Sequence, residues 1–300
     1  MKNIVIKLKS LINGLWGEII KIACNLNIVR PLYSIEDVFD KDKKIIVTLT
    51  SYGRRVNSIL HYTIISLLRQ TRKPDMIILW LDNVNWCYDN LPKNIKKLQK
   101  FGVQVRFCED LKSYKKLIPT LKEFPNDIII TCDDDIFYKS NMIEMLVVEY
   151  EKNPNRVYAH RGHMIKMSNT GIMPYKEWTK EVSDVESLYV LPTTGGGCLY
   201  TSNLLYKDTT DSSIFMKLAP KADDVWMYFM VYLNKTPIYV LPKKGYIYTE
   251  IDFFYQRMHT SASLYRLNCG ESQNDLQIKN IISYYNIDFL EDIDRNQTNL

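Results

Sequence analysis

The sequence predicts an α/β protein in which a mostly parallel sheet is covered by helices on both faces. Three observations predict this fold class. Apolar, strand-like runs alternate with segments whose apolar residues recur at helical spacing, and this alternation builds parallel sheets. The runs are apolar almost without a break, as is typical of strands buried on both faces. The composition, 46% hydrophobic and 24% charged over 300 residues, indicates a globular protein with a sizeable core.

Residues 1–44 are predicted to form an N-terminal helical extension. The segment MKNIVIKLKSLINGLWGEIIKIACNLNIVR lacks the unbroken apolar centre and the small-residue cleavage site of a signal peptide. No stretch of about 18 uninterrupted apolar residues occurs in the chain, which argues against a transmembrane helix. The lysines among its apolar residues are Lys2, Lys7, Lys9 and Lys21. Two interpretations stay open: a basic helix at a membrane interface, or an amphipathic helix packed on its own domain.

Residues 45–285 are predicted to form one domain, with residues 286–300 as a tail. The first strand is KIIVTLTSY, followed by GRR as a turn and VNSILHYTIISLLRQT as a helix. A proline opens the second strand, KPDMIILWLDN, and the next helix, LPKNIKKLQKFG, has proline near its first turn and glycine at its end. The strand VQVRFC, the polar connection EDLKSYKKLIPTLKEFP and the strand DIIIT follow. NMIEMLVVEYEKNP then has helical spacing.

Three consecutive aspartates, Asp133, Asp134 and Asp135, follow the fourth predicted strand directly. Ligands of open α/β sheets bind at the carboxyl ends of the parallel strands. Because alternate residues of an extended segment share a side, Asp133 and Asp135 are expected to converge while Asp134 turns away. Two converging carboxylates suit a hard divalent cation, magnesium or manganese, bound together with substrate phosphate. A solvated acidic loop is the alternative, but apolar residues on both sides of the triplet favour the cation.

A second acidic pair, Asp223 and Asp224, opens the apolar helical run of KADDVWMYFMVYL. Carboxylates at the first turn of a helix are favoured by its dipole and often cap it. The same position would suit a general base that accepts a proton from a hydroxyl nucleophile. Both interpretations stay open from the residues alone.

A run of three glycines, Gly195, Gly196 and Gly197, lies in LPTTGGGCLYTS. Such a run is entropically unfavourable unless the backbone must approach something closely, and bare N–H groups could contact a substrate. A flexible loop tip is the alternative. Lys115 and Lys116 could reach a diphosphate, although lysines in such a segment are more often solvated.

Cysteines, histidines and net charge argue against several classes of protein. Six cysteines without a CxxC pair indicate reduced thiols in a cytosolic protein, not a disulfide framework or a zinc site. His160 and His163 have a spacing that some metal sites use, but no cysteine or further histidine accompanies them. The net charge of +5 is too small to indicate a nucleic-acid partner.

Four segments in order, IIVTLTSYGRR, ISLLRQTRKPDMIILWL, YKKLIPTLKEFPNDIIITCDDDIFY and ADDVW, resemble a bacterial family 2 glycosyltransferase of the capsule or lipopolysaccharide type. The resemblance spans residues 45–285. It implies the GT-A (nucleotide-diphospho-sugar transferase) fold with its Rossmann-like sheet, and a metal-dependent transfer with inversion at the anomeric carbon. It also implies a nucleotide-sugar donor, with a UDP-sugar as the expected one, and a saccharide or lipid-linked saccharide acceptor. The implied role is bacterial surface-polysaccharide synthesis in the cytoplasm or at the inner face of the plasma membrane.

The resemblance also implies roles for individual residues. Asp135 would hold the metal, Asp133 would touch the metal or the ribose, and His259 would be a late third metal ligand. Asp224 would be the catalytic base, with Asp223 as the second candidate. The glycines would contact substrate. The expected donor-binding residues are Thr48, Ser51, Tyr52, Arg54, Asp82, Lys116, Asp133 and Asp134.

Two other functions remain as alternatives. A sugar-phosphate nucleotidyltransferase would use a related sheet, but it should have a glycine-rich phosphate loop after the first strand, and SYGRR offers one glycine. A non-catalytic carbohydrate-binding protein on the same fold would not need either acidic cluster.

Overall fold

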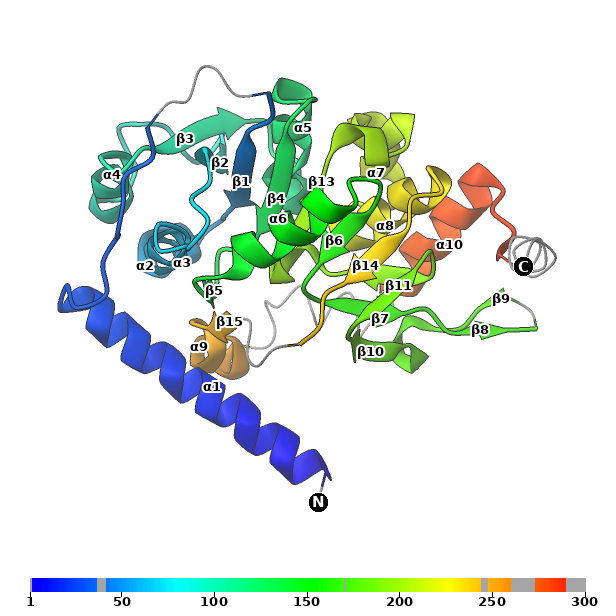
Figure 1. Cartoon of the computed structure of the whole chain (residues 1–300), viewed down its shortest axis with the longest axis horizontal. Helices are drawn as coiled ribbons and strands as arrows, with labels where there is room; N and C mark the ends of the chain where they lie inside the picture. Colours follow the sequence, from blue (N-terminus) through cyan, green and yellow to red (C-terminus); the bar gives the residue numbers. More distant parts are fainter. Residues whose placement is uncertain (1, 37–41, 170, 244–247, 260–272, 290–300) are drawn as a thin grey trace.

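The computed structural model describes residues 2–36, 42–169, 171–243, 248–259 and 273–289. At its centre is an eight-stranded sheet with the order β11-β14-β6-β13-β4-β1-β2-β3 (Figure 1). Its strands are β1 (Ile45–Thr50), β2 (Met76–Asp82), β3 (Val103–Cys108), β4 (Ile128–Cys132), β6 (Val157–Ala159), β11 (Val185–Ser187), β13 (Cys198–Tyr200) and β14 (Ile238–Val240). Only β13 and β11 run antiparallel to their neighbours in this sheet. The predicted α/β class with a mostly parallel sheet is therefore confirmed.

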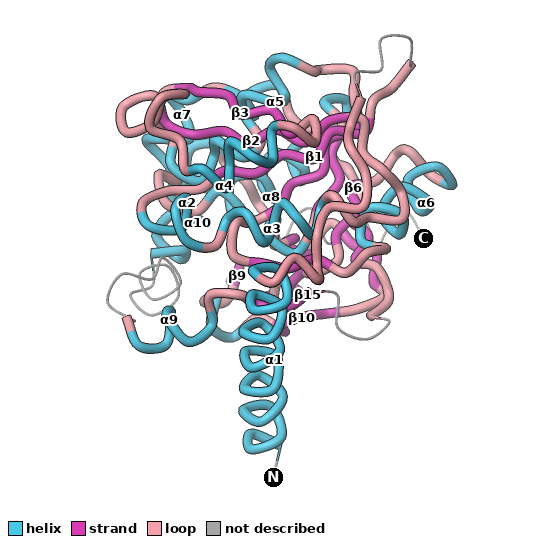
Figure 2. Tube along the Cα trace, turned by 90° about the vertical axis from the view of Figure 1, so that its left-hand side faces the viewer, coloured by secondary structure: helices cyan, strands magenta, loops and turns pink. Residues whose placement is uncertain are grey.

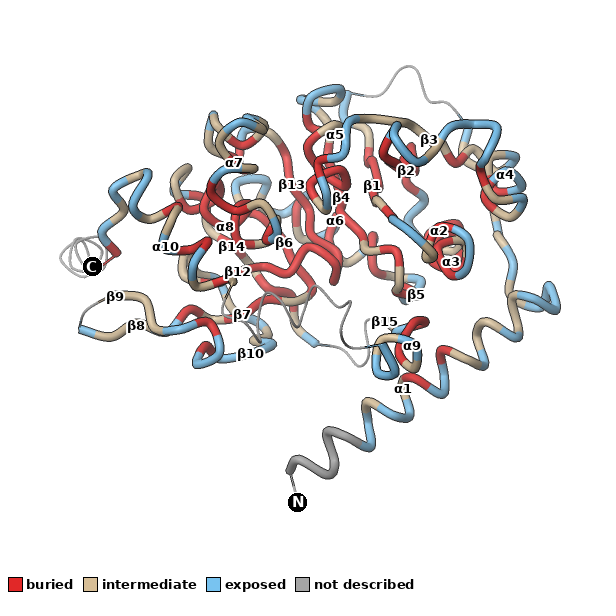
Figure 3. The backbone as a smooth tube through the Cα atoms, turned by 180° about the vertical axis from the view of Figure 1, so that it is seen from behind, coloured by how far each residue is buried: buried red, intermediate tan, exposed pale blue. Residues whose placement is uncertain are grey.

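Helices cover both faces of this sheet. One face carries α3 (Leu60–Leu67), α4 (Lys93–Gln99) and α6 (Met142–Lys152). The other carries α5 (Ile118–Glu123), α7 (Ser212–Leu218), α8 (Asp223–Leu233) and α10 (Gln273–Tyr285). Alternate residues of β4 serve the two layers, since Ile128 and Ile130 belong to the first core and Ile129 to the second. Strands buried on both faces (Figure 3) explain the continuous apolar runs in the sequence.

The other described elements lie outside the central sheet and the helices that cover it. The remaining helices are α1 (Lys2–Asn25), α2 (Arg54–Ser58) and α9 (Phe253–Met258). The 3-10 helices are η1 (Lys112–Lys116), η2 (Tyr175–Glu177), η3 (Thr194–Gly196), η4 (Ser202–Leu204) and η5 (Lys207–Thr210). The strands outside the central sheet are β5 (Ile136–Tyr138), β7 (Gly162–Met164), β8 (Met167–Ser168), β9 (Gly171–Ile172), β10 (Thr179–Val182), β12 (Val190–Pro192) and β15 (Tyr248–Glu250).

Strand register brings three distant segments to one edge of the sheet. β1 and β4 are parallel neighbours with Leu49 opposite Cys132, so the residues after both strands emerge side by side. β13 is antiparallel to β4 with Cys198 opposite Thr131, so the glycines before β13 reach the same edge. β5 pairs with β15, which adds a segment from the C-terminal part of the chain. This edge is where the sequence predicted a ligand site.

Two predicted segments fold differently from expectation. GRR, predicted as a turn, begins α2 at Arg54 after Gly53, whose φ is 56°. EDLKSYKKLIPTLKEFP, predicted as a polar connection, contains η1 and α5. α1 confirms the predicted N-terminal helix, and no described helix is long and apolar enough to cross a membrane. The division of the chain at residues 44 and 285 stays a prediction.

Candidate active site

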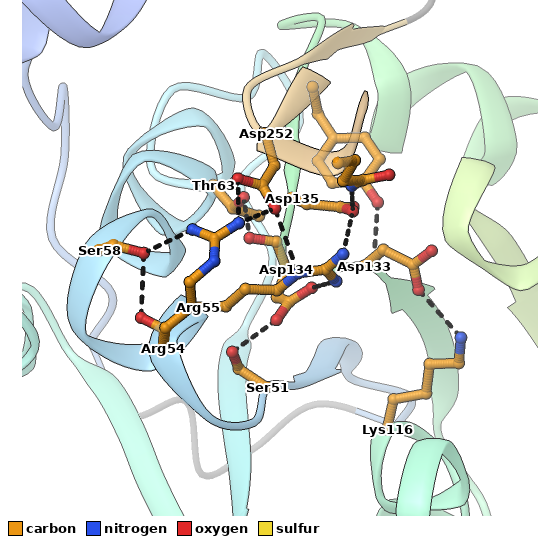
Figure 4. Close-up of polar contacts among 12 residues, drawn as sticks. Ser51, Arg54, Arg55, Ser58, Thr63, Lys116, Asp133, Asp134, Asp135 and Asp252 are labelled. Carbon is orange, nitrogen blue, oxygen red and sulfur yellow. Dashed lines mark hydrogen bonds and ion pairs between the residues drawn. The ribbon is translucent and has the colours of Figure 1, made fainter. Parts of the chain in front are cut away.

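The aspartate triplet forms a tight turn between β4 and β5, not a continuation of the strand. This corrects the prediction that Asp133 and Asp135 converge while Asp134 turns away. Asp134 and Asp135 instead share one guanidinium, and Asp133 points toward Lys116 (Figure 4). The alternation of side chains holds only for extended backbone, and it ends where the chain turns.

Arg55 is the cation at the centre of the acids. Its Nη1 lies 2.8 Å from Asp134 Oδ1, its Nη2 lies 3.0 Å from Asp135 Oδ2 and its Nε lies 3.5 Å from Asp252 Oδ2. The planar guanidinium has donors pointing in several directions, so one side chain can serve three carboxylates. These acids raise the pKa of Arg55 even though its burial acts to lower it. Arg55 therefore remains charged and holds α2 against the turn.

Two further residues of the C-terminal part join this group. Asp252 precedes α9 and accepts two hydrogen bonds from Arg54 Nη2, at 2.5 and 2.6 Å. The Arg54 guanidinium also stacks 3.1 Å from the centre of the Tyr255 ring. Gln256 donates to Asp135 Oδ2 at 2.8 Å. Arg54, predicted to meet phosphate, is thus paired with a carboxylate and an aromatic ring of α9.

Lys116 connects the aspartate triplet to the second acidic pair. Its Nζ lies 2.9 Å from Asp133 Oδ1 and 2.9 Å from Asp223 Oδ2. The residue is 6% exposed, and it belongs to η1, in a segment predicted as a polar connection. Burial acts to lower the pKa of Lys116, but Asp133 and Asp223 outweigh it and raise that pKa. Lys115 turns elsewhere and pairs with Asp110.

Asp224 lies in the first turn of α8 but does not cap that helix with its side chain. Its Oδ1 accepts from the backbone N–H of Thr194 at 3.0 Å and from the Thr194 hydroxyl at 2.5 Å. Burial, with the neighbouring charge of Asp223 second, raises the pKa of Asp224 to about 6. A small cavity of about 60 Å³ borders both acids and is also lined by Tyr175 and Asn274. The Asp224 side chain therefore does not take the capping role.

The three glycines are buried, so the flexible loop tip is ruled out. A Cβ on Gly195 would lie 1.8 Å from Asp133 Oδ2, so only glycine permits this approach of backbone and carboxylate. Tyr138 ties the same two segments together, since its hydroxyl accepts from the Asp133 N–H at 2.8 Å and donates to the Gly195 carbonyl at 2.5 Å. Gly197 has a φ of 99°, a value that favours glycine.

The three carboxyls of the triplet differ in proton affinity. Burial pushes the pKa of Asp133 up, but Lys116 outweighs burial and the net shift is downward. Burial raises the pKa of Asp134, against the opposing effect of Arg55. Burial raises the pKa of Asp135 to about 7, with Arg55 opposing and the neighbouring carboxylates adding to the rise.

The other predicted donor-binding residues differ in how far they are buried and in whether they contact the acidic cluster. Ser51 donates to Asp134 Oδ2 at 2.5 Å and belongs to the cluster. Tyr52 is 49% exposed, with its ring 5.7 Å from the Arg55 guanidinium. Asp82 ends β2 and accepts from the backbone and side-chain nitrogens of Asn85. Thr48 is fully buried and shares a hydrogen bond with Thr120, so the placement expected for it at the crevice is corrected: it lies too early in β1.

His259 lies outside the acidic cluster. It follows α9, is exposed, and stacks on the Tyr255 ring with the ring centres 4.0 Å apart. Its Nδ1 also meets the Tyr255 carbonyl oxygen at 3.1 Å. The structure thus gives the predicted third metal ligand partners within its own helix, because a histidine four residues after a tyrosine meets it on one helix face.

The cluster carries carboxylate oxygens, the type of ligand that a divalent cation prefers. Five carboxylates share three basic side chains in its ion pairs. Two negative charges are in excess when all are ionised. In the described part of the chain no group of three or more His, Cys, Asp or Glu could hold a metal ion. One or two carboxylates with substrate phosphate are the usual magnesium arrangement, so these residues fit a cation that arrives with its substrate.

Sequence reasoning missed Arg55, Asp252, Thr194, Gln256 and Tyr138. Arg55 stands next to the predicted Arg54 in GRR. If GRR had been predicted as the start of a helix, the two side chains would have been expected to point about 100° apart. Thr194 adjoins the glycines, and its hydroxyl could have been predicted from the sequence to donate a hydrogen bond at the site. Asp252 and Gln256 lie in a segment without a motif, and only the pairing of β5 with β15 brings them to the triplet.

Known proteins resemble this chain in sequence family and in fold. The Glycosyl transferase family 2 model matches residues 46–235. The chain is similar to the solved structure of S. aureus TarS 1-349 in complex with UDP, at 18% identity and a TM-score of 0.46, covering 81% of this chain and 72% of that chain. It is similar at 12% identity to CMP:2-keto-3-deoxy-manno-octonic acid synthetase complexed with CTP, with a TM-score of 0.42 and coverage of 68% and 90%. The inositol-1-phosphate CTP transferase from T. maritima also matches, at 12% identity, a TM-score of 0.43 and coverage of 71% and 91%. No curated protein matches.

Proposed function

The chain belongs to glycosyl transferase family 2 and is a glycosyltransferase acting on nucleotide sugars, and from this premise we propose a metal-dependent inverting transfer to a saccharide hydroxyl. The donor is a UDP-sugar, and the acceptor is a saccharide or a lipid-linked saccharide. The role is bacterial surface-polysaccharide synthesis, and it rests on the sequence resemblance. The reaction takes place in the cytoplasm or at the inner face of the plasma membrane, where thiols stay reduced. The five described cysteines are all free, in keeping with that compartment.

One observation carries the proposal. Lys116 lies 2.9 Å from both Asp133 and Asp223, so a single buried ammonium joins the acids after β4 to the acids that begin α8. Asp133 and Asp223 are 90 residues apart in the sequence. Direct displacement needs an acid that holds the metal and an acid that accepts the proton at the same sugar. A donor diphosphate that reached Lys116 would meet a positive charge, with the Asp224 carboxylate close by.

The chemical step assigns one task to each residue. The acceptor oxygen forms a bond to the anomeric carbon as the bond from that carbon to the diphosphate oxygen breaks, and the hydroxyl proton passes to Asp224. Thr194 holds the Asp224 carboxylate by two hydrogen bonds, which orients its other oxygen. A divalent cation held by Asp135 together with substrate phosphate would supply Lewis-acid stabilisation of the departing diphosphate. Lys116 adds a fixed positive charge beside the same group.

Separate replacement of the two key acids tests these assignments. We expect Asp224→Asn to lower kcat by roughly 10²- to 10⁴-fold, the range for loss of a general base. Asp135→Asn should lower activity and weaken its dependence on manganese concentration. Glu151→Gln is the matched control, because Glu151 of α6 is an exposed acid that pairs with Arg72. The measurement is sugar transfer from UDP-, GDP- and CMP-sugars, with and without manganese or magnesium.

The pH profile sharpens the test of Asp224. Because its pKa is raised to about 6, the carboxylate is mostly protonated below that pH and cannot accept a proton. The kcat/KM of the wild-type enzyme should therefore rise with pH through about 6, while the residual rate of Asp224→Asn should lack the step near pH 6. Near-normal transfer by Asp224→Asn would remove the base assignment. Release of pyrophosphate from a nucleoside triphosphate would favour a nucleotidyltransferase instead.

A further inference from the structure

We propose that α1 docks on an anionic lipid surface through an apolar stripe that the rest of the protein leaves open. The exposed fractions of the residues in this stripe run from 40% to 59%. The stripe consists of Leu8, Leu11, Ile12, Leu15, Trp16, Ile19 and Ile22. The inference stands independently of the proposed function, because none of these residues lies in the acidic cluster.

The spacing of the stripe places it on one face of the helix. Its central members, Leu8, Ile12, Leu15, Ile19 and Ile22, are separated by four, three, four and three residues. Side chains at this spacing lie above one another on a helix. Leu11 and Trp16 widen the stripe on either side. A stripe this continuous is unusual on a free protein surface, because exposed apolar patches of this kind commonly mark contact sites.

The opposite face of α1 is fixed to the domain. A Cβ on Gly14 would lie 2.2 Å from Phe253 Cδ1, and one on Gly17 would lie 2.3 Å from the Glu250 carbonyl oxygen. The Glu250 backbone N–H also donates to Asn13 Oδ1 at 2.9 Å. At about 100° per residue, Gly17 points roughly 160° away from Leu15. The glycine face seats α1 on β15 and α9, so the apolar stripe must point outward.

The overall shape agrees with this orientation. α1 lies along one side of the molecule next to β15 and α9, and its N-terminal part projects beyond the body (Figures 1 and 2). The chain continues apolar after the helix, since Leu26, Ile28 and Leu32 are 66–71% exposed. An amphipathic helix that lies in a membrane interface needs such an open apolar face.

Charge distinguishes a lipid surface from a second copy of the chain. Within α1 the charged residues are Lys2, Lys7, Lys9, Glu18 and Lys21, four basic against one acidic. Two such helices packed against each other would bring lysines together with few acids to offset them. An anionic headgroup layer complements the same charges. Trp16 also has the amphipathic ring that prefers the level of the headgroups.

Docking in this way would hold the candidate active site near the membrane. The segment under α1 is the one that meets the aspartate turn, because the Ile251 backbone N–H donates to the Asp135 carbonyl oxygen at 3.0 Å. Asp252 and Gln256 follow in the same segment. The docked helix would therefore be joined to the acids through β15 and α9.

Vesicle binding by the full chain tests the inference. The probes are vesicles of phosphatidylcholine alone and of phosphatidylcholine with phosphatidylglycerol at roughly three to one, chosen because the attraction should depend on anionic lipid. We expect the protein to co-sediment with the mixed vesicles, and added salt to weaken binding. Leu15→Glu should reduce the bound fraction about tenfold, since a charge replaces buried apolar surface. Leu276→Glu, at a 52% exposed leucine of α10, is the matched control and should bind as the wild type does.

Two further readouts decide between outcomes. Emission from Trp16, taken as the difference between wild type and Trp16→Phe, should shift to shorter wavelength with mixed vesicles. Equal binding by wild type and Leu15→Glu would overturn the proposal. So would a wild-type dimer that Leu15→Glu dissociates, with no vesicle binding, because the stripe would then be an interface between copies. Donor hydrolysis should be the same in Leu15→Glu and wild type. If the proposed activity is wrong, both proteins will lack hydrolysis whether or not they bind vesicles, so this failure can be distinguished from a failure of lipid binding.

Discussion

At the scale of single residues, the candidate site depends on how a few cations are shared among many acids. Arg55 serves Asp134, Asp135 and Asp252, and Lys116 serves Asp133 and Asp223. Both cations lie at positions where burial alone would favour their neutral form, and the acids keep them charged. Loss of either cation would leave buried carboxylates without compensation.

Replacing Arg55 should therefore destabilise the protein far more than replacing an exposed arginine. Arg55→Met removes the partner of Asp134, whose side chain is 6% exposed, and we expect the free energy of unfolding to fall by about 3 kcal/mol. Arg72→Met is the control, because its pair with Glu151 is about half exposed and should contribute less than about 0.5 kcal/mol. Urea denaturation followed by circular dichroism measures both. Equal effects would show that Arg55 has no special part in the folded state.

At the scale of elements, the site is built where two tight segments meet. The turn between β4 and β5 carries the aspartates, and η3 carries Thr194, Gly195 and Gly196. Tyr138 joins the two through hydrogen bonds to Asp133 and Gly195, although Gly195 lies 57 residues after Tyr138 in the sequence. The position of the Asp133 carboxylate therefore depends on the backbone of a segment that is distant along the chain.

Gly195→Ala tests this dependence. The added Cβ would occupy the place of Asp133 Oδ2, so the carboxylate that pairs with Lys116 must change its position. We expect the transfer rate to fall by roughly 10²-fold, the effect of misplacing a catalytic group by about 1 Å. Thr193→Val serves as a control in the same segment, because the buried Thr193 hydroxyl has no hydrogen-bond partner among the described residues and its removal should leave stability nearly unchanged. Normal transfer by Gly195→Ala would show that the approach of Gly195 to Asp133 is incidental.

At the scale of the whole molecule, one edge of the sheet collects residues from the first strand to α9. A donor bound there with its metal would contact both halves of the chain, and it would bind only when they are folded together. Ligand binding to the folded state alone raises the melting temperature. The melting temperature in the presence of donor therefore measures whether the complete site is formed.

Donor and metal together should stabilise the protein. With a UDP-sugar and manganese at about a hundred times Kd, we expect the melting temperature to rise by roughly 5 °C, and EDTA should remove most of this gain. Asp135→Asn should lose the gain while Glu151→Gln keeps it. Differential scanning fluorimetry measures the shift for each nucleotide sugar. A shift that is unaffected by EDTA would argue that the donor binds without a cation.

The fold class and the general place of the site could be read from the sequence. Continuous apolar runs predicted strands buried on both faces, and the aspartates after DIIIT predicted acids at the carboxyl edge of the sheet. These features are encoded by neighbouring residues, whose periodicity is local. The direction of each acid was not predictable in this way, because the backbone leaves the extended form at Asp133 and alternation no longer applies.

What only the tertiary structure decided is which distant residues share charge and which faces stay open. The Arg54–Asp252 pair joins residues 198 positions apart, and no local pattern connects them. The residues of α1 alone showed that the helix is amphipathic. Only the structure showed that Gly14 and Gly17 lie against Phe253 and Glu250, which places the apolar face on the outside. Local periodicity specifies which residues form a face, whereas long-range packing determines what that face meets.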